Sequence, residues 1–94
     1  MKIITVHCFA KSDRREELVA LCRSMVGPSR AESGCIHYSF YKDLGVENSY
    51  FFYEEWKDQE SIDRHNASPH FLEFQPKFIA LTAGEPVITV HTVE

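Results

Sequence analysis

The segment from Tyr53 to Phe71, YEEWKDQESIDRHNASPHF, concentrates side chains that can carry out acid–base chemistry. It contains the carboxyl of Glu54, the indole of Trp56 and the imidazole of His65. An imidazole titrates near neutral pH, so histidine suits either a general base or a hydrogen-bonded structural role. The question is whether these groups lie on the surface or converge on one pocket.

His65 is expected to point inward, because it follows an isoleucine by three residues on one short helix. Two interpretations remain open for it: a general base, or a histidine at the edge of the core that is bonded to a neighbour. Glu54 and Glu55 point to opposite faces of their strand, so one of them enters a covered face, where a carboxylate needs a partner. Arg64 or Lys57 would make a purely structural pair with it.

Four further side chains are candidates for the same pocket. Trp56 is either a packing residue or a ligand platform, and its N–H needs an acceptor. Gln75 lies in the apolar stripe of the last helix, where it either lines a cavity or satisfies backbone loosened by the following proline. His7 interrupts an apolar strand. His70 begins a helix, and its spacing from His65 is not that of a helical metal pair, so no metal site is predicted.

Composition limits the possible partners. The chain has 94 residues, which predicts a single domain over 1–94, and a hydrophobic content of 44% is enough for a core. A net charge of −4 with scattered basic residues argues against nucleic acid and anionic membranes. The amino-terminal apolar run is too short for a membrane span.

Cofactor and redox signals are also weak in this sequence. Its three cysteines lack C-x-x-C spacing, which indicates reduced thiols in a cytoplasmic protein. Its four glycines form no nucleotide-binding fingerprint, and there is no haem-attachment motif, so no cofactor is predicted.

Periodicity predicts the elements that must position these side chains. Alternating apolar residues predict strands over 2–9, 35–42, 49–56 and 87–93. A capping box of Asp13 and Glu16 should begin the first helix, and Gly27–Pro28 should end or kink it. Asp58 and Ser68–Pro69 should begin two shorter helices. The order β-α-β-β-α-β, with its second helix broken in two, is the ferredoxin-like α+β plan.

The predicted sheet has no polar face. Its third strand, SYFFYEEW, is aromatic on both sides, and the first strand is apolar on both sides apart from His7. Helices should cover one face only, and the chain has no spare helix for the other. A second copy packed sheet against sheet would cover it, so we expect a homodimer.

Two stretches, ESGCIHY (Glu32–Tyr38) and FYEEWKDQESIDRHNASPHF (Phe52–Phe71), resemble the antibiotic biosynthesis monooxygenase domain family. The family pattern is E-x-G-C near the second strand, E-x-W on the third, and then H-x-x-S-P-H-F. With compatible flanking strands the resemblance spans nearly the whole chain. It is a strong marker of fold and a poor marker of substrate, because family members perform different chemistry on one scaffold.

The resemblance implies a dimeric α+β barrel with a pocket between sheet and broken helix. It implies oxygenation of a quinol or related small aromatic by dioxygen, without metal, flavin or haem. His65 would be the general base, with Glu54 as its orienting partner. The candidates for substrate binding are Trp56, His7, Gln75, Phe71 and His70.

Two other functions remain open. One is an isomerase of a small oxygenated or phosphorylated metabolite, which would need a cation at the pocket mouth; Lys57, Arg64 and Lys77 are near enough in sequence. The other is a dimer that binds a small molecule without turnover. Haem degradation is not expected, because the haem-degrading relatives use an Asn, a Trp and a His at positions that here hold His7, His65 and Gln75.

Overall fold

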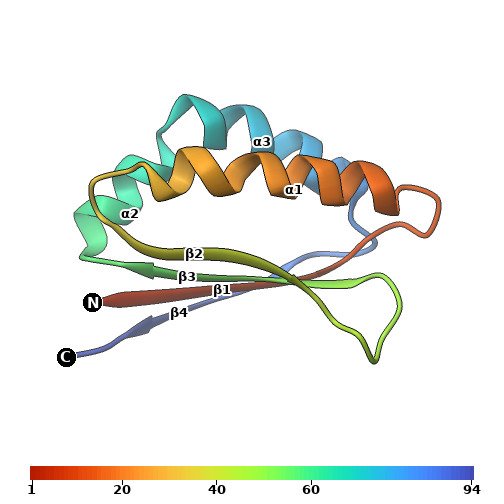
Figure 1. The fold of residues 1–94 in the computed structure, drawn as a ribbon, viewed down its shortest axis with the longest axis horizontal. Helices are drawn as coiled ribbons and strands as arrows, with labels where there is room; N and C mark the ends of the chain where they lie inside the picture. Colours follow the sequence, from red (N-terminus) through yellow and green to blue (C-terminus); the bar gives the residue numbers. More distant parts are fainter.

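The computed structural model describes residues 1–94 as one antiparallel sheet with helices on one face (Figure 1). The elements are β1 (Lys2–Phe9), α1 (Arg15–Arg30), β2 (Cys35–Lys42), β3 (Ser49–Trp56), α2 (Gln59–Asn66), α3 (Pro69–Leu81) and β4 (Val87–Thr92). The strand order across the sheet is β2-β3-β1-β4. The predicted ferredoxin-like α+β fold is confirmed, including the second helix split into α2 and α3.

Strand alternation builds the core as predicted. On β1, Ile4 and Cys8 are buried against the helices, and Ile4 pairs with Glu54 on β3. Helix α1 contributes a fully buried stripe to the same layer, which consists of Leu18, Cys22 and Met25. Glu54 therefore lies on the helix-covered face, inside the hydrophobic layer.

The two short helices begin where the sequence predicts. The Asp58 side chain accepts a hydrogen bond from the Ser61 backbone N–H at 2.8 Å and caps α2. The Ser68 hydroxyl accepts from the Phe71 N–H at 3.3 Å and caps α3, with proline in its first turn. These caps fix the chain direction around His65, which lies in the last turn of α2.

Helix α1 differs from the prediction at both ends. The expected capping box of Asp13 and Glu16 does not form, because a turn closed by the Arg14 N–H on the Lys11 carbonyl delays the helix to Arg15. Pro28 does not end the helix, which continues to Arg30. A proline near the end of a helix removes only one of its last hydrogen bonds, and here the helix tolerates that loss.

A β-bulge lies near the start of β2. Cys35 pairs with Trp56 and His37 with Glu55, so the extra residue Ile36 falls between the two pairs. Cys35 consequently packs against the core, and the Ile36 side chain is 55% exposed. Strict alternation along 35–42 would instead put Ile36 on the same face as the buried Tyr38.

No helix covers the second face of the sheet (Figure 1). This outer sheet face carries the side chains of Thr5, His7 and Phe9 from β1, opposite to Ile4 and Cys8 in the strand alternation. Phe51 and Tyr53 of β3 lie beside them in the strand register. Homodimer formation through this face stays a prediction. None of the helices has the length and apolarity needed to cross a membrane.

Candidate functional site

A cavity of about 530 Å³ lies between the helix-covered face of the sheet, α2 and α3. Of its 17 lining residues, 11 are hydrophobic, so it suits an apolar ligand with a few fixed polar contacts. Its aromatic wall consists of Tyr38, Phe52, Phe71, Phe74 and Phe78. The volume is in the range of pockets that enclose a small organic molecule.

The cavity has an apolar rim formed by α3 and the edge strand β4. Ile79, Ile88 and Val90 line it and are all more than half exposed. Gln75 also lines it from α3 and is exposed. Gln75 therefore lies at the rim, which corrects its predicted place on the core-facing stripe.

His65 is the imidazole that lines this cavity. It is 2% exposed and packs against Trp56 and Phe71, with ring centroids 4.6 and 5.2 Å away. Its Nδ1 is hydrogen-bonded to Glu32 Oε2 at 2.6 Å, while its Nε2 has no partner in the protein. The buried polar atoms without a partner are Ser29 Oγ and Asn48 Oδ1 only, so Nε2 of His65 is open to the cavity.

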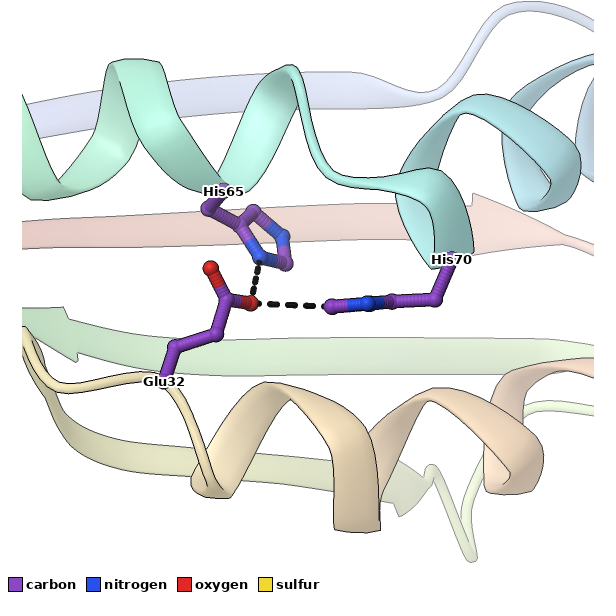
Figure 2. A group of neighbouring side chains, drawn as sticks. All are labelled: Glu32, His65 and His70. Atoms are coloured by element: carbon purple, nitrogen blue, oxygen red, sulfur yellow. Dashed lines mark hydrogen bonds and ion pairs between the residues drawn. The ribbon is translucent and has the colours of Figure 1, made fainter.

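Glu32 joins two histidines through one oxygen atom. Figure 2 shows Glu32, from the turn between α1 and β2, reaching His65 at the end of α2 and His70 at the start of α3. His70 Nε2 lies 2.9 Å from the same Oε2. A carboxylate oxygen accepts, so His65 donates its Nδ1–H and its Nε2 carries the free lone pair when the ring is neutral.

Burial shifts the pKa values of His65 and Glu54 in the cavity wall. Desolvation lowers the pKa of His65, and the hydrogen bond and charge of Glu32 oppose this. Desolvation raises the pKa of Glu54 to about 7; the Trp56 hydrogen bond opposes the rise, and the charge of Glu32 adds to it. The cavity therefore combines a histidine that favours the neutral form with a carboxyl that keeps its proton up to near-neutral pH.

Glu54 is not the partner of His65, contrary to the sequence prediction. Its Oε1 accepts a hydrogen bond from the Trp56 indole N–H at 2.9 Å. It also has no ion pair with Arg64 or Lys57, and Arg64 pairs with Glu60 instead. The two-residue spacing puts both Glu54 and Trp56 on one face of β3, so the nearest buried donor is the indole.

The structure brings together only some of the predicted site residues. His65, Glu54, Phe71 and Gln75 line the cavity. Trp56 is fully buried behind the cavity wall, where it bonds to Glu54 and packs against the His65 ring. The other two candidates, His70 and His7, do not line it.

His70 and His7 lie elsewhere for different reasons. His70 borders a separate surface hollow beside α1, and it meets the site through its bond to Glu32 and through its ring, whose centroid lies 5.8 Å from that of His65. His7 is on the outer sheet face, where it is hydrogen-bonded to the Ser49 hydroxyl at 2.8 Å. Side chains alternate between the two faces of β1, so His7 lies on the face opposite to Ile4. His7 therefore does not line this cavity.

Glu32 is the site residue that reasoning from the residues alone missed. It is 33 positions from His65 in the sequence, and only the packing of α2 onto the α1–β2 turn joins them. Gly34 permits that packing, because a Cβ there would lie 2.0 Å from Ser61 Oγ. The signal for Glu32 in the sequence was the E-x-G-C motif. Its Glu binds the His65 ring, and its Gly leaves room for Ser61 of α2.

Comparison with known proteins places the chain in a family. The family model described as "Antibiotic biosynthesis monooxygenase" matches residues 1–77. "Putative monooxygenase YcnE" of Bacillus subtilis is 34% identical over 98% of this chain and 96% of its own length. The isomerase of (4S)-4-hydroxy-5-phosphonooxypentane-2,3-dione from Klebsiella pneumoniae is 28% identical over 77% of this chain and 74% of its own.

Two further matches extend this likeness. "Uncharacterized protein sll1783" of Synechocystis is 40% identical over 88% of this chain, and the match spans only 56% of that relative's length. The solved structure of Rv0793 from Mycobacterium tuberculosis superposes with a TM-score of 0.94 at 26% identity, covering 99% of this chain and 94% of the other. On this evidence the chain belongs to the antibiotic biosynthesis monooxygenase family.

Proposed function

We propose that this protein is a cofactor-independent monooxygenase of a quinol or a related small aromatic, with His65 as general base. The observation that carries the proposal is the unpartnered Nε2 of His65, open to a cavity walled by aromatic side chains. A base inside such a cavity meets a phenolic hydroxyl in a largely water-free environment, where charge interactions are strong.

The proposed reaction begins with proton transfer from a quinol hydroxyl to His65 Nε2. The resulting quinolate is electron-rich enough to reduce dioxygen directly. One oxygen atom then enters the ring and the other leaves in water, so that quinol and dioxygen give a hydroxyquinone and water. The quinol supplies all the electrons that this stoichiometry requires.

Glu32 and Glu54 would support this step in different ways. Glu32 fixes the His65 ring through Nδ1 and stabilises the imidazolium that proton uptake creates. Glu54 retains a proton near neutral pH and has one oxygen free of protein hydrogen bonds, so it can donate to a substrate oxygen. Both are proposed roles.

A second copy of the chain is part of the proposal. The uncovered outer sheet face, with its half-buried aromatic side chains, is the surface on which a homodimer would form. Dimerisation would enclose the sheet on both faces and give the barrel expected for this family.

The alternative function, an isomerase of a phosphorylated metabolite, has support from the relatives named for that activity. His65 and Glu54 would then move protons beside a carbonyl. No arginine or lysine lines the cavity, however, and the nearby Arg64 and Lys77 pair with Glu60 and Glu73. A phosphate group would find no cationic partner within this cavity, so we favour an uncharged aromatic.

Oxygen uptake with menadiol or an anthrone, above the enzyme-free rate, tests the proposal. In His65→Asn the shorter side chain retains an N–H donor but lacks the equivalent of Nε2. We expect kcat to fall by about 10²–10⁴-fold, the usual contribution of a general base. Glu16→Gln, at an exposed residue of α1 away from the cavity and from the outer sheet face, is the control.

Two results would contradict the proposal: no enzyme-dependent uptake by the wild type, or equal uptake in a folded His65→Asn variant. Proton exchange into a ketose phosphate without oxygen uptake would instead favour the isomerase. Circular dichroism and thermal unfolding of each variant would exclude misfolding as the cause of any loss.

A further inference from the structure

We propose that Glu32, His65 and His70 form a binding site for a divalent transition-metal ion such as Zn²⁺. Three potential ligand atoms, Glu32 Oε2, His65 Nδ1 and His70 Nε2, all lie within 4.8 Å of one another. They come from the α1–β2 turn, α2 and α3, so the fold and not a local motif assembles them (Figure 2).

The chemistry of the donor set defines the ion. Two imidazole nitrogens and one carboxylate oxygen match the ligands of zinc sites that keep an open position. Imidazole suits Zn²⁺, Co²⁺, Ni²⁺ and Cu²⁺, whereas Mg²⁺ and Ca²⁺ prefer sites made of oxygen atoms. The site should therefore discriminate strongly between Zn²⁺ and Mg²⁺.

Charge at the site also favours a cation. The only side chains bonded to Glu32 are the two imidazoles. The nearest cation in sequence, Arg30, is directed away to the Tyr38 carbonyl and the Ser39 hydroxyl. No arginine or lysine pairs with Glu32 or would have to be displaced by an ion.

The site allows both entry and adjustment. His65 is almost fully buried, but the side chains of Glu32 and His70 are 18% and 25% exposed, so an ion can reach them from the surface. Two ligands at about 2 Å from a tetrahedral ion lie roughly 3.3 Å apart. The present separations from Oε2 are 2.6 and 2.9 Å, and the three atoms lie within 4.8 Å of one another, so Glu32 must draw back slightly while the two imidazole nitrogens adjust to the ion.

Metal binding would change the chemistry of His65, a consequence that rests on the function proposed above. An ion on Nδ1 displaces the proton that this nitrogen shares with Glu32. A neutral ring must then carry its proton on Nε2, which becomes a donor instead of a base. Zn²⁺ should therefore inhibit the proposed oxygenation while it binds outside the cavity.

The binding test uses the purified, chelator-treated protein, with ZnCl₂ in isothermal titration calorimetry and CoCl₂ in visible absorption. We expect one ion per chain, a tetrahedral Co²⁺ spectrum and no heat with MgCl₂. His70→Gln and Glu32→Gln should each weaken Zn²⁺ binding by at least tenfold, and His91→Gln should bind like the wild type. No saturable binding, or equal weakening in His91→Gln, would overturn the proposal.

The inhibition test adds ZnCl₂ to the oxygen-uptake assay of the wild type and of Glu16→Gln, an exposed position on α1. We expect uptake to fall in both with the dissociation constant measured by calorimetry, and to recover on addition of a chelator. If Zn²⁺ binds but oxygen uptake does not fall, the metal site is supported and the predicted change of His65 from base to donor is disproved. A wild type without oxygen uptake would contradict the proposed function, and the binding test would still decide the metal site.

Discussion

The Glu32 carboxylate accepts a hydrogen bond from His65 Nδ1 at 2.6 Å, across the junction of the α1–β2 turn with α2. His65 is thereby held in one tautomer with its second nitrogen toward the cavity. The same oxygen also accepts from His70, so Glu32 is restrained on two sides. This arrangement makes Glu32 a positioning residue and gives it a testable effect on the ring.

Glu32→Gln should lower kcat for oxygen uptake by roughly tenfold or more, and less than the loss of the base itself. The amide oxygen still accepts from His65, but it lacks the charge that stabilises the imidazolium. KM should change little, because Glu32 does not line the cavity.

A nitrogen NMR spectrum of the histidine rings separates positioning from a general structural defect. The wild-type His65 ring should show the Nδ1–H tautomer, and Glu32→Ala should shift it toward a mixture. A wild-type ring protonated mainly on Nε2 would contradict the role given to Glu32.

Local sequence patterns predict most of the helices and strands of this fold, but they do not predict which side chains meet in the site. The bounds of β1, β2 and β3 agree with prediction because alternation and flanking turn residues are local signals. Alternation alone misplaces Ile36, because the bulge beside it depends on pairing with the partner strand. The partner of His65 was predicted as Glu54, a near neighbour, whereas the true partner, Glu32, depends on how two distant segments pack.

Glu54 should make stability depend on pH. Its pKa is raised from 4.5 to about 7 in the folded chain, because burial disfavours the carboxylate. Below pH 4.5 both states are protonated and there is no penalty. As pH rises from about 4.5 to 7 the unfolded chain loses this proton first, so stability falls, by up to roughly 3 kcal/mol above pH 7.

Glu54→Gln should remove this dependence, because the amide oxygen still accepts from the Trp56 indole without a charge to desolvate. Urea unfolding of both proteins at a fixed concentration, from pH 5 to pH 8, measures it. The variant should gain stability relative to the wild type as pH rises. A difference that stays constant over this range would show that Glu54 is ionised throughout.

Gly34→Ala should destabilise the protein by about 1–3 kcal/mol through overpacking. An added Cβ would lie 2.0 Å from Ser61 Oγ and 2.3 Å from Ser61 Cβ, at the contact that holds α2 against the α1–β2 turn. Separating these segments would also lengthen the bond from Glu32 to His65.

Gly45→Ala is the matched control for that substitution. Its nearest non-neighbouring atom is Asp43 Oδ1 at 3.5 Å, and its φ is not positive. Its stability should stay within about 0.5 kcal/mol of the wild type. Equal urea midpoints for the two variants would show that the Gly34 contact relaxes at no cost.

A charge on the outer sheet face should separate the proposed homodimer into monomers. Phe51 is half-buried in the central strand β3 and points away from the helices. In Phe51→Asp, dimerisation would bury a carboxylate without a partner, which is strongly unfavourable. Light scattering after size-exclusion chromatography should give twice 10.9 kDa for the wild type and 10.9 kDa for the variant.

Leu72→Asp places the same charge on α3, where the leucine is 58% exposed on the helical side, and should leave the dimer mass unchanged. The comparison distinguishes loss of a specific interface from a general effect of added charge. A monomeric wild type at micromolar concentration would disprove the homodimer, because the aromatic face would then be stable in water. A dimer that dissociates with Leu72→Asp and persists with Phe51→Asp would place the interface on the helices instead.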